Sequence, residues 1–173
     1  MININAKNDE YDSFPLYIAS KENNIEIVEY LLMQGADVNT ENSDEWTSLI
    51  IDSQEDYLHV AKYLLKHGAD VNTKMNDGSS SLYIASQNGH LQVAKLLLEQ
   101  GADVNTKKNN GCSSLYIASQ QGHLHIVKLL LEQGAELNAK MNDGSSSLGL
   151  AGININFDII NNFYKVKSEM LLL

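Results

Sequence analysis

Residues 76–106 read NDGSSSLYIASQNGHLQVAKLLLEQGADVNT, and this stretch decides the fold because the rest of the chain repeats it. Its closing triplet of Gly, Ala and an acidic residue recurs every 33 residues, beginning at Gly35, Gly68, Gly101 and Gly134. The octapeptide Met75–Leu82 returns unchanged as Met141–Leu148, two periods later. A fixed period of this length indicates a solenoid of stacked repeats.

Each repeat is predicted to hold two short helices. Ser80 is expected to cap the first helix by accepting a hydrogen bond from an otherwise unpaired N–H. Gly89 tolerates a positive φ and ends this helix just after Gln87. The second helix is predicted from about His90 to Gln100, because its leucines recur at helical spacing on one face. Neither helix is long enough to be stable alone, so each repeat must stack on a neighbour.

This unit resembles the ankyrin repeat over about residues 9–173. The positions that match the family pattern are Gly78, Ser80, Leu82, Ala85, Gly89-His90, Leu96-Leu97-Leu98 and Gly101-Ala102-Asp103-Val104-Asn105. The departures are regular: Ser-Ser pairs replace the family's Thr-Pro, and tyrosines replace its histidine at Tyr17, Tyr83 and Tyr116. The resemblance implies an all-α ankyrin-repeat solenoid of stacked helix-turn-helix units joined by hairpin loops.

The period divides the chain into a leader and five units. Residues 1–8 are the leader, and the units cover 9–41, 42–74, 75–107, 108–140 and 141–173. The first unit is expected to be an N-terminal cap and the last a degenerate C-terminal cap, each with the polar outer face that terminal repeats need. The first unit holds eight acidic residues against one lysine, a net charge of −7, which would also suit an acidic binding patch.

Composition excludes several classes of partner. The net charge is −10 and the pI is about 4.8, and all twelve cationic residues are lysines. This argues against nucleic acid, because Lys and Arg contacts to phosphate supply most of that affinity. It argues equally against an anionic membrane surface. With one cysteine, Cys112, no internal disulfide can form, so we expect a cytoplasmic or otherwise intracellular protein that is monomeric on its own.

The resemblance implies that another protein binds the concave surface made by hairpin tips and first helices. The candidate contact residues there are Tyr11, Asp44, Trp46, Gln54, Glu55, Asp77, Ser79, Gln87, Asn88, Asn110, Cys112, Gln120 and Gln121. Acidic and aromatic residues lie toward the N-terminal end and amides toward the C-terminal end. We therefore expect the partner's contact surface to be basic. Trp46 is either an interface anchor, since Trp is enriched in hot spots, or a side chain folded back on the next hairpin.

Two single positions depart from the repeat pattern. Asp52 occupies a slot that holds alanine in three other units, at Ala19, Ala85 and Ala118. It is either a functional perturbation or local drift, and we expect drift, with its carboxylate bonded to a loop N–H. Cys112 is expected to be an unreactive surface thiol, because its neighbours offer no base to activate it.

No catalytic, cofactor-binding or metal-binding motif is present. The resemblance places His90 and His123 in a structural turn where the ring bonds nearby backbone. The remaining histidines lack a second ligand at zinc-like spacing. The chain has no phosphate-binding Gly-rich loop and no nucleophile motif. We therefore predict a protein that is not an enzyme and needs no cofactor.

Three functions remain open from the sequence. The first is a non-catalytic interaction module, a scaffold, adaptor or effector that binds a partner protein. The second is a structural component of a larger assembly. The third is a substrate of an asparaginyl hydroxylase, because the hairpin asparagines Asn39, Asn72, Asn105 and Asn138 resemble those modified in ankyrin repeats. The alternative role for these asparagines is to hold the hairpins together by hydrogen bonds.

Overall fold

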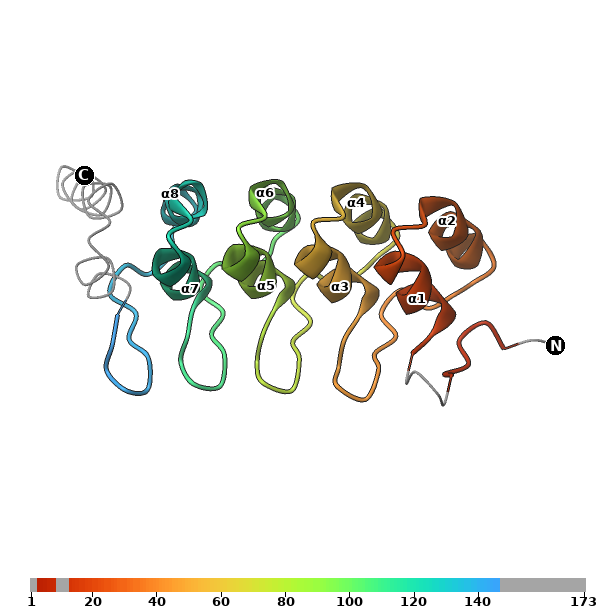
Figure 1. Ribbon diagram of the computed structural model, residues 1–173, viewed down its shortest axis with the longest axis horizontal. Helices are drawn as coiled ribbons and strands as arrows, with labels where there is room; N and C mark the ends of the chain where they lie inside the picture. The colour runs from red at the N-terminus through yellow and green to blue at the C-terminus, as the bar shows by residue number, and fades with distance from the viewer. Residues whose placement is uncertain (1–2, 9–12, 147–173) are drawn as a thin grey trace.

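The computed structural model describes residues 3–8 and 13–146, and in them eight short helices stack in two layers (Figure 1). The inner layer, next to the hairpin loops, contains α1 (Pro15–Lys21), α3 (Ser48–Glu55), α5 (Ser81–Asn88) and α7 (Ser114–Gln121). The outer layer contains α2 (Ile25–Met33), α4 (Leu58–Lys66), α6 (Leu91–Glu99) and α8 (Leu124–Glu132). The predicted all-α solenoid is confirmed. The degenerate last unit lies, apart from its first six residues, outside the described residues.

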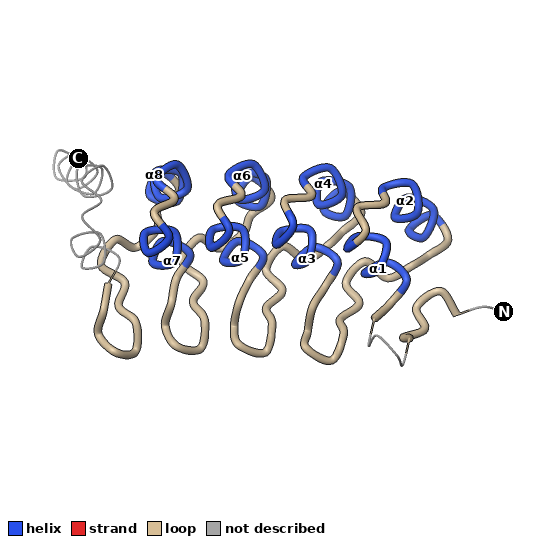
Figure 2. Tube along the Cα trace, viewed as in Figure 1, coloured by secondary structure: helices blue, strands red, loops and turns tan. Residues whose placement is uncertain are grey.

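Hairpin loops project from the inner layer, all to the same side (Figure 2). Within the described ranges they contain isolated bridges such as Lys74 with Ser80, but no named strand. The loops before α3, α5 and α7 end where a hydroxyl caps the helix: Ser80 Oγ accepts from Tyr83 N at 3.2 Å, as predicted. In the second unit Thr47 caps α3 in the same way. Each of these caps satisfies one of the unpaired N–H groups at the start of its helix.

The core runs without interruption along the stack. Each inner helix contacts the next inner helix, and each outer helix contacts the next outer helix. Leu64, Leu97 and Leu130, at equivalent positions of α4, α6 and α8, have no exposed surface. The stacking prediction is therefore confirmed: the two helices of a unit pack on one another, and the neighbouring unit covers the apolar surface that this packing leaves.

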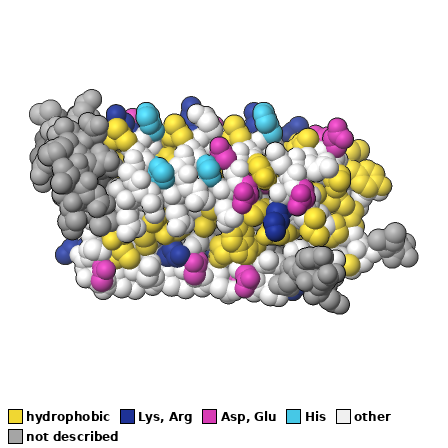
Figure 3. Space-filling view, in the orientation of Figure 1, with side chains coloured by type: hydrophobic (Ala, Val, Ile, Leu, Met, Phe, Trp, Pro, Cys, Tyr) yellow, Lys and Arg dark blue, Asp and Glu magenta, His cyan; other side chains and the backbone are white. Residues whose placement is uncertain are grey.

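The outer face of the first unit, which we expected to be polar, exposes apolar side chains as well as carboxylates. Its face away from the second unit exposes Ile18, Ile27, Tyr30 and Met33, which are the exposed large hydrophobic residues of the described chain. Figure 3 shows hydrophobic side chains gathered at this end of the molecule. Of the acidic residues of this unit, Glu22 lines the same cleft as Ile18 and Ile27.

Residues 3–8 are held against the first unit. Asn5 Oδ1 accepts from Asp37 N at 2.9 Å, and Lys7 Nζ donates to Ser43 Oγ at 2.6 Å. Ile4 packs on the core. The leader thus contributes contacts of its own, which the sequence analysis did not predict.

Two glycines, one in a hairpin and one at the end of a helix, allow the cost of backbone strain to be distinguished from the cost of a steric clash. Gly78 and Gly101 both have positive φ, +83° and +88°. A Cβ on Gly78 would lie 2.8 Å from Asn109 Oδ1 and 2.9 Å from Asn109 N, whereas a Cβ on Gly101 meets nothing within 4 Å.

We expect Gly101→Ala to lower the free energy of unfolding by about 1–2 kcal/mol, the strain of a left-handed residue with a Cβ. Gly78→Ala should cost clearly more, because the next hairpin must also move. Urea unfolding followed by circular dichroism measures both. Equal losses in the two variants would show that the contact between hairpins contributes nothing to stability.

Candidate protein-binding surface

The candidate contact residues differ in accessibility. Those with exposed side chains are Asp44, Glu55, Asp77, Asn88, Asn110, Gln120 and Gln121, and those that are half-buried are Trp46, Gln54 and Gln87. Ser79 and Cys112 are buried, with 1% and 3% of their surface exposed. Tyr11 lies outside the described residues. Ser79 and Cys112 are therefore left out of the surface that a partner could touch.

Trp46 has features of both alternatives. It packs against a cluster of buried residues at the base of the hairpins, which we call the hairpin-side cluster: Ile50, Tyr83, Ile84, Cys112, Tyr116 and Ile117. The side chain is nevertheless only half-buried. One part of the side chain packs on this cluster while the rest stays accessible, so the residue is held in place before any partner arrives.

Tyr17 lies close to two carboxylates of the neighbouring unit. Burial raises the pKa of the Tyr17 phenol, and the charges of Glu55 and Asp44 raise that pKa further. These three residues come from α1, the end of α3 and the hairpin between them. Figure 3 shows that, among the described residues, acidic side chains are more frequent over the N-terminal half of this face. The structure thus places a tyrosine hydroxyl and two carboxylates in one negative region.

Farther along the stack, the hairpin carboxylate of Asp77 is already paired with a lysine. Lys108 Nζ lies 2.7 Å from Asp77 Oδ2 and 5.0 Å from the centre of the Tyr83 ring. Desolvation disfavours the charge on Asp77, but hydrogen bonds from Lys108 and Ser79 outweigh it and keep the pKa of this carboxyl below its ordinary value. Asp77 therefore offers a partner less free charge than Asp44 or Glu55.

The tyrosines that replace the expected histidine connect successive units. Tyr83 OH donates to Cys112 Sγ at 3.8 Å, and Tyr116 OH is 3.2 Å from Ser145 Oγ. The expected surface position of Cys112 is wrong, because its side chain is buried in the hairpin-side cluster, and this burial raises the pKa of the thiol. In the second unit Ile50 stands where the others have tyrosine. Ser79 Oγ accordingly has no hydrogen-bond partner among the described residues.

The hairpin asparagines bind across units. Asn39 Oδ1 accepts from Asp70 N at 2.8 Å, and its Nδ2 donates to Gly68 O at 3.1 Å. Asn72 makes the same pair of bonds to Asp103 and Gly101, and Asn105 to Glu136 and Gly134. Asn5 repeats the first of these bonds with Asp37. The Ile4-Asn5 pair, similar to Val38-Asn39, was the sequence signal that could have revealed it.

The rings of two histidines also make hydrogen bonds between units. Nε2 of His90 is 2.9 Å from Gln54 O, and Nε2 of His123 is 3.0 Å from Gln87 O. The predicted ring-to-backbone bond is confirmed, although the carbonyl belongs to the preceding unit and not to the same turn. In the described part of the chain, no group of three His, Cys, Asp or Glu side chains could hold a metal ion.

These inter-unit bonds follow the 33-residue period, and the sequence profile of one family matches in the same register. The profile described as "Ankyrin repeats (3 copies)" matches residues 1–75, 49–141 and 82–164. The chain belongs to the ankyrin-repeat family. No curated protein matches the sequence at a significant level. Ankyrin repeats are generally protein–protein interaction modules, typically without catalysis, and here no helix of the described residues is long and apolar enough to cross a membrane.

The second ankyrin repeat contains a buried acid without a partner. Asp52 has no exposed surface, and neither carboxylate oxygen has a hydrogen-bond partner among the described residues. The expected bond from a loop N–H is therefore wrong: Tyr57 N, the nearest candidate, donates to the backbone oxygen of Asp52. Burial raises the pKa of Asp52 well above its ordinary value. At the equivalent position Ala85 and Ala118 are also fully buried.

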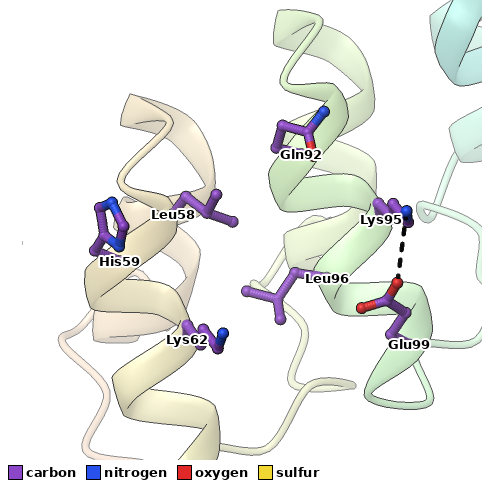
Figure 4. A pocket seen from close by; sticks show the side chains of 7 residues that line it. All are labelled: Leu58, His59, Lys62, Gln92, Lys95, Leu96 and Glu99. Atoms are coloured by element: carbon purple, nitrogen blue, oxygen red, sulfur yellow. Dashed lines mark ion pairs between the residues drawn. The ribbon is translucent and has the colours of Figure 1, made fainter.

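A second feature, not predicted from the sequence, is a groove between the outer helices of the second and third ankyrin repeats (Figure 4). It has a volume of about 240 Å³ and is lined by Leu58, His59, Lys62, Gln92, Lys95, Leu96 and Glu99. Leu58 and Leu96 point toward one another across it, and Lys95 pairs with Glu99 at 3.9 Å. The groove shows which side chains of one outer helix lie opposite those of the next.

We expect Asp52→Ala to stabilise the chain by about 1–3 kcal/mol, because it removes an unpaired buried polar group. Since burial raises the pKa of Asp52, the folded chain keeps this proton to a higher pH than the unfolded chain. The contribution that the protonated Asp52 carboxyl makes to the free energy of unfolding is fully present below about pH 4. It is lost as the pH rises through the raised pKa of Asp52.

The advantage of the Asp52→Ala variant should therefore grow as the pH rises above about 4. Urea unfolding at several pH values measures it, with Asp44→Ala, at an exposed site, as the control. Unchanged stability combined with loss of partner binding would show instead that Asp52 is a functional residue.

Proposed function

We propose that this ankyrin-repeat chain is a non-catalytic adaptor that binds a basic surface of another protein. The contact would lie on the hairpin tips and inner helices, centred on the first two repeats. The observation that carries the proposal is the group formed by Tyr17, Asp44, Trp46 and Glu55, in which accessible aromatic surface lies beside unpaired negative charge. We further propose that the chain acts inside the cell, since its single cysteine, Cys112, allows no internal disulfide. We also propose that it is monomeric on its own.

Trp46 supports the proposal because it is already positioned. A side chain that rests on the hairpin-side cluster loses little conformational freedom when a partner covers its remaining surface. Large aromatic residues of this kind supply much of the binding energy in interfaces. The amides farther along, such as Gln120 and Gln121, contribute adaptable hydrogen bonds but little buried area.

Electrostatics supports a basic partner. Glu55 and Asp44 are exposed, and both raise the pKa of the Tyr17 phenol, so the local potential is negative. A lysine or arginine placed here would gain from both carboxylates and could contact the aromatic rings. Exposed charges of this kind increase the rate and selectivity of association more than the final affinity.

The asparagine-hydroxylation alternative receives less support. In Asn39, Asn72 and Asn105 both the amide oxygen and the amide nitrogen are already bonded to the next repeat. The possible partners of Asn138 lie outside the described residues. These bonds favour a structural role for the asparagines, and mass spectrometry of the native protein for a 16 Da increase per modified asparagine would detect hydroxylation.

The adaptor proposal is tested with a partner captured on the full chain and then titrated by calorimetry. Trp46→Ala should weaken binding by about 2 kcal/mol or more, roughly 30-fold, because it removes the aromatic contact area. Glu55→Lys, at an exposed site that should not disturb folding, should weaken the same complex, and added salt should weaken it further.

Gln92→Ala, on an exposed outer-helix position, is the matched control and should leave the affinity unchanged. A complex that tolerates Trp46→Ala, Glu55→Lys and high salt would contradict the proposal. The partner would then contact another part of the molecule.

A further inference from the structure

The N-terminal end face of the first repeat consists of Ile18, Ile27, Tyr30, Met33 and the cleft beside them. These four are the large hydrophobic side chains that are exposed among the described residues. Its residues have equivalents in every other described repeat. Ile27 is 47% exposed, whereas Val60, Val93 and Ile126 at the same position are 0–1% exposed. Ile18 and Ile27 are therefore side chains of the type that the neighbouring repeat covers elsewhere in the described residues.

The cleft in this face lies at a position that a neighbouring repeat covers in the rest of the described stack. It has a volume of about 360 Å³, is mostly apolar, and lies between α1 and α2. The lining residues are Pro15, Ile18, Ala19, Glu22, Asn24, Ile27 and Leu31. In the second, third and fourth repeats the outer-helix residue equivalent to Leu31 is fully buried, and each of those outer helices contacts the outer helix before it. The shape that fits this face is therefore a helix.

The groove between α4 and α6 shows what would lie opposite such a helix. There His59 and Lys62 of the covering helix lie on the groove with Gln92 and Lys95 of the covered helix (Figure 4). On α2 the residues equivalent to Gln92 and Lys95 are Glu26 and Glu29.

The first repeat thus presents two carboxylates at the positions that face a covering helix. Glu22 lines the cleft itself, and Lys21 is the one cation among the nine charged residues of this repeat. A lysine or arginine on the covering helix, in the place that Lys62 takes on α4, would lie beside Glu26 and Glu29. Opposite charges at a contact rim select the partner and exclude helices with acidic edges.

We propose that the N-terminal end face is a second docking site, distinct from the concave surface, which takes an amphipathic helix with basic edges from a partner protein. The apolar side of that helix covers Ile18 and Ile27, and its cations face Glu26 and Glu29. A second copy of this chain is a poorer occupant in face-to-face contact, because a repeat of net charge −7 would then meet another of the same charge.

The test uses the full chain and a fluorescent peptide with the sequence of residues 57–67, which contains the whole of α4. A hydrocarbon staple joins the positions of Val60 and Leu64, which face the preceding repeat in the folded chain, and leaves the Leu58 and Lys62 side free. We expect saturable binding by fluorescence anisotropy. Ile27→Asp should weaken it about tenfold or more, because apolar burial is lost. Gln92→Asp, at an exposed site on α6, is the matched control and should bind normally.

Charge reversal tests the basic character of the ligand. Glu26→Lys with Glu29→Lys should weaken binding of the lysine peptide and strengthen binding of a peptide in which glutamate replaces both lysines. Glu99→Lys with Glu132→Lys, which changes the net charge equally on other outer helices, should change neither.

Several results would overturn the proposal. One is the absence of saturable binding, and another is binding that tolerates Ile27→Asp or the Glu26/Glu29 reversal. Loss of peptide binding in Trp46→Ala would move the site to the concave surface. Sedimentation that shows the chain associating with itself, and Ile27→Asp abolishing that association, would identify a second copy as the occupant instead.

Discussion

The structure depends on one constraint: the apolar face of each helix pair is covered by the neighbouring repeat. Helices of seven to nine residues are too short to be stable alone. Val60, Val93 and Ile126 are completely or almost completely buried because an outer helix of the preceding repeat lies on them, whereas Ile27 has none. Stability is therefore shared along the stack, and an end of the stack exposes whatever the repeat pattern would otherwise bury.

Polar groups repeat with the same period and fix the register of this stacking. Asn39, Asn72 and Asn105 each bind two backbone groups of the next repeat, while His90 and His123 bind a carbonyl of the preceding one. These bonds satisfy polar groups that stacking would otherwise leave unpaired, and a one-residue shift between neighbours would break all of them. The same bonds explain why many amide, imidazole and hydroxyl groups here are structural and not available for chemistry.

Local features of the fold were predictable, and features that depend on a neighbour were not. The helices, the Ser80 cap and the glycine at each helix end follow from spacing and backbone preference inside one repeat. Cys112 stands at a hairpin position that we expected to be exposed, but it is buried in the stack, and its thiol meets the hydroxyl of Tyr83, 29 residues earlier. Asp52 could be placed in an alanine slot, but its lack of any bonding partner depends on the helices on either side. For the same reason, the acidic composition of the first repeat could not reveal that Ile18 and Ile27 remain uncovered.

Acidic side chains and exposed apolar side chains occur together at the N-terminal end, and together they determine which partners can bind there. Apolar area supplies most of the affinity of an interface, but it does not distinguish one apolar helix from another. Glu26 and Glu29 disfavour acidic helices, and Asp44 and Glu55 do the same on the concave side. Like charge also opposes contact between the N-terminal ends of two copies, so the exposed isoleucines lie where self-association is least favoured. A stack built from nearly identical repeats can in this way acquire a preferred end for recognition through a few charge changes, without any change in its fold.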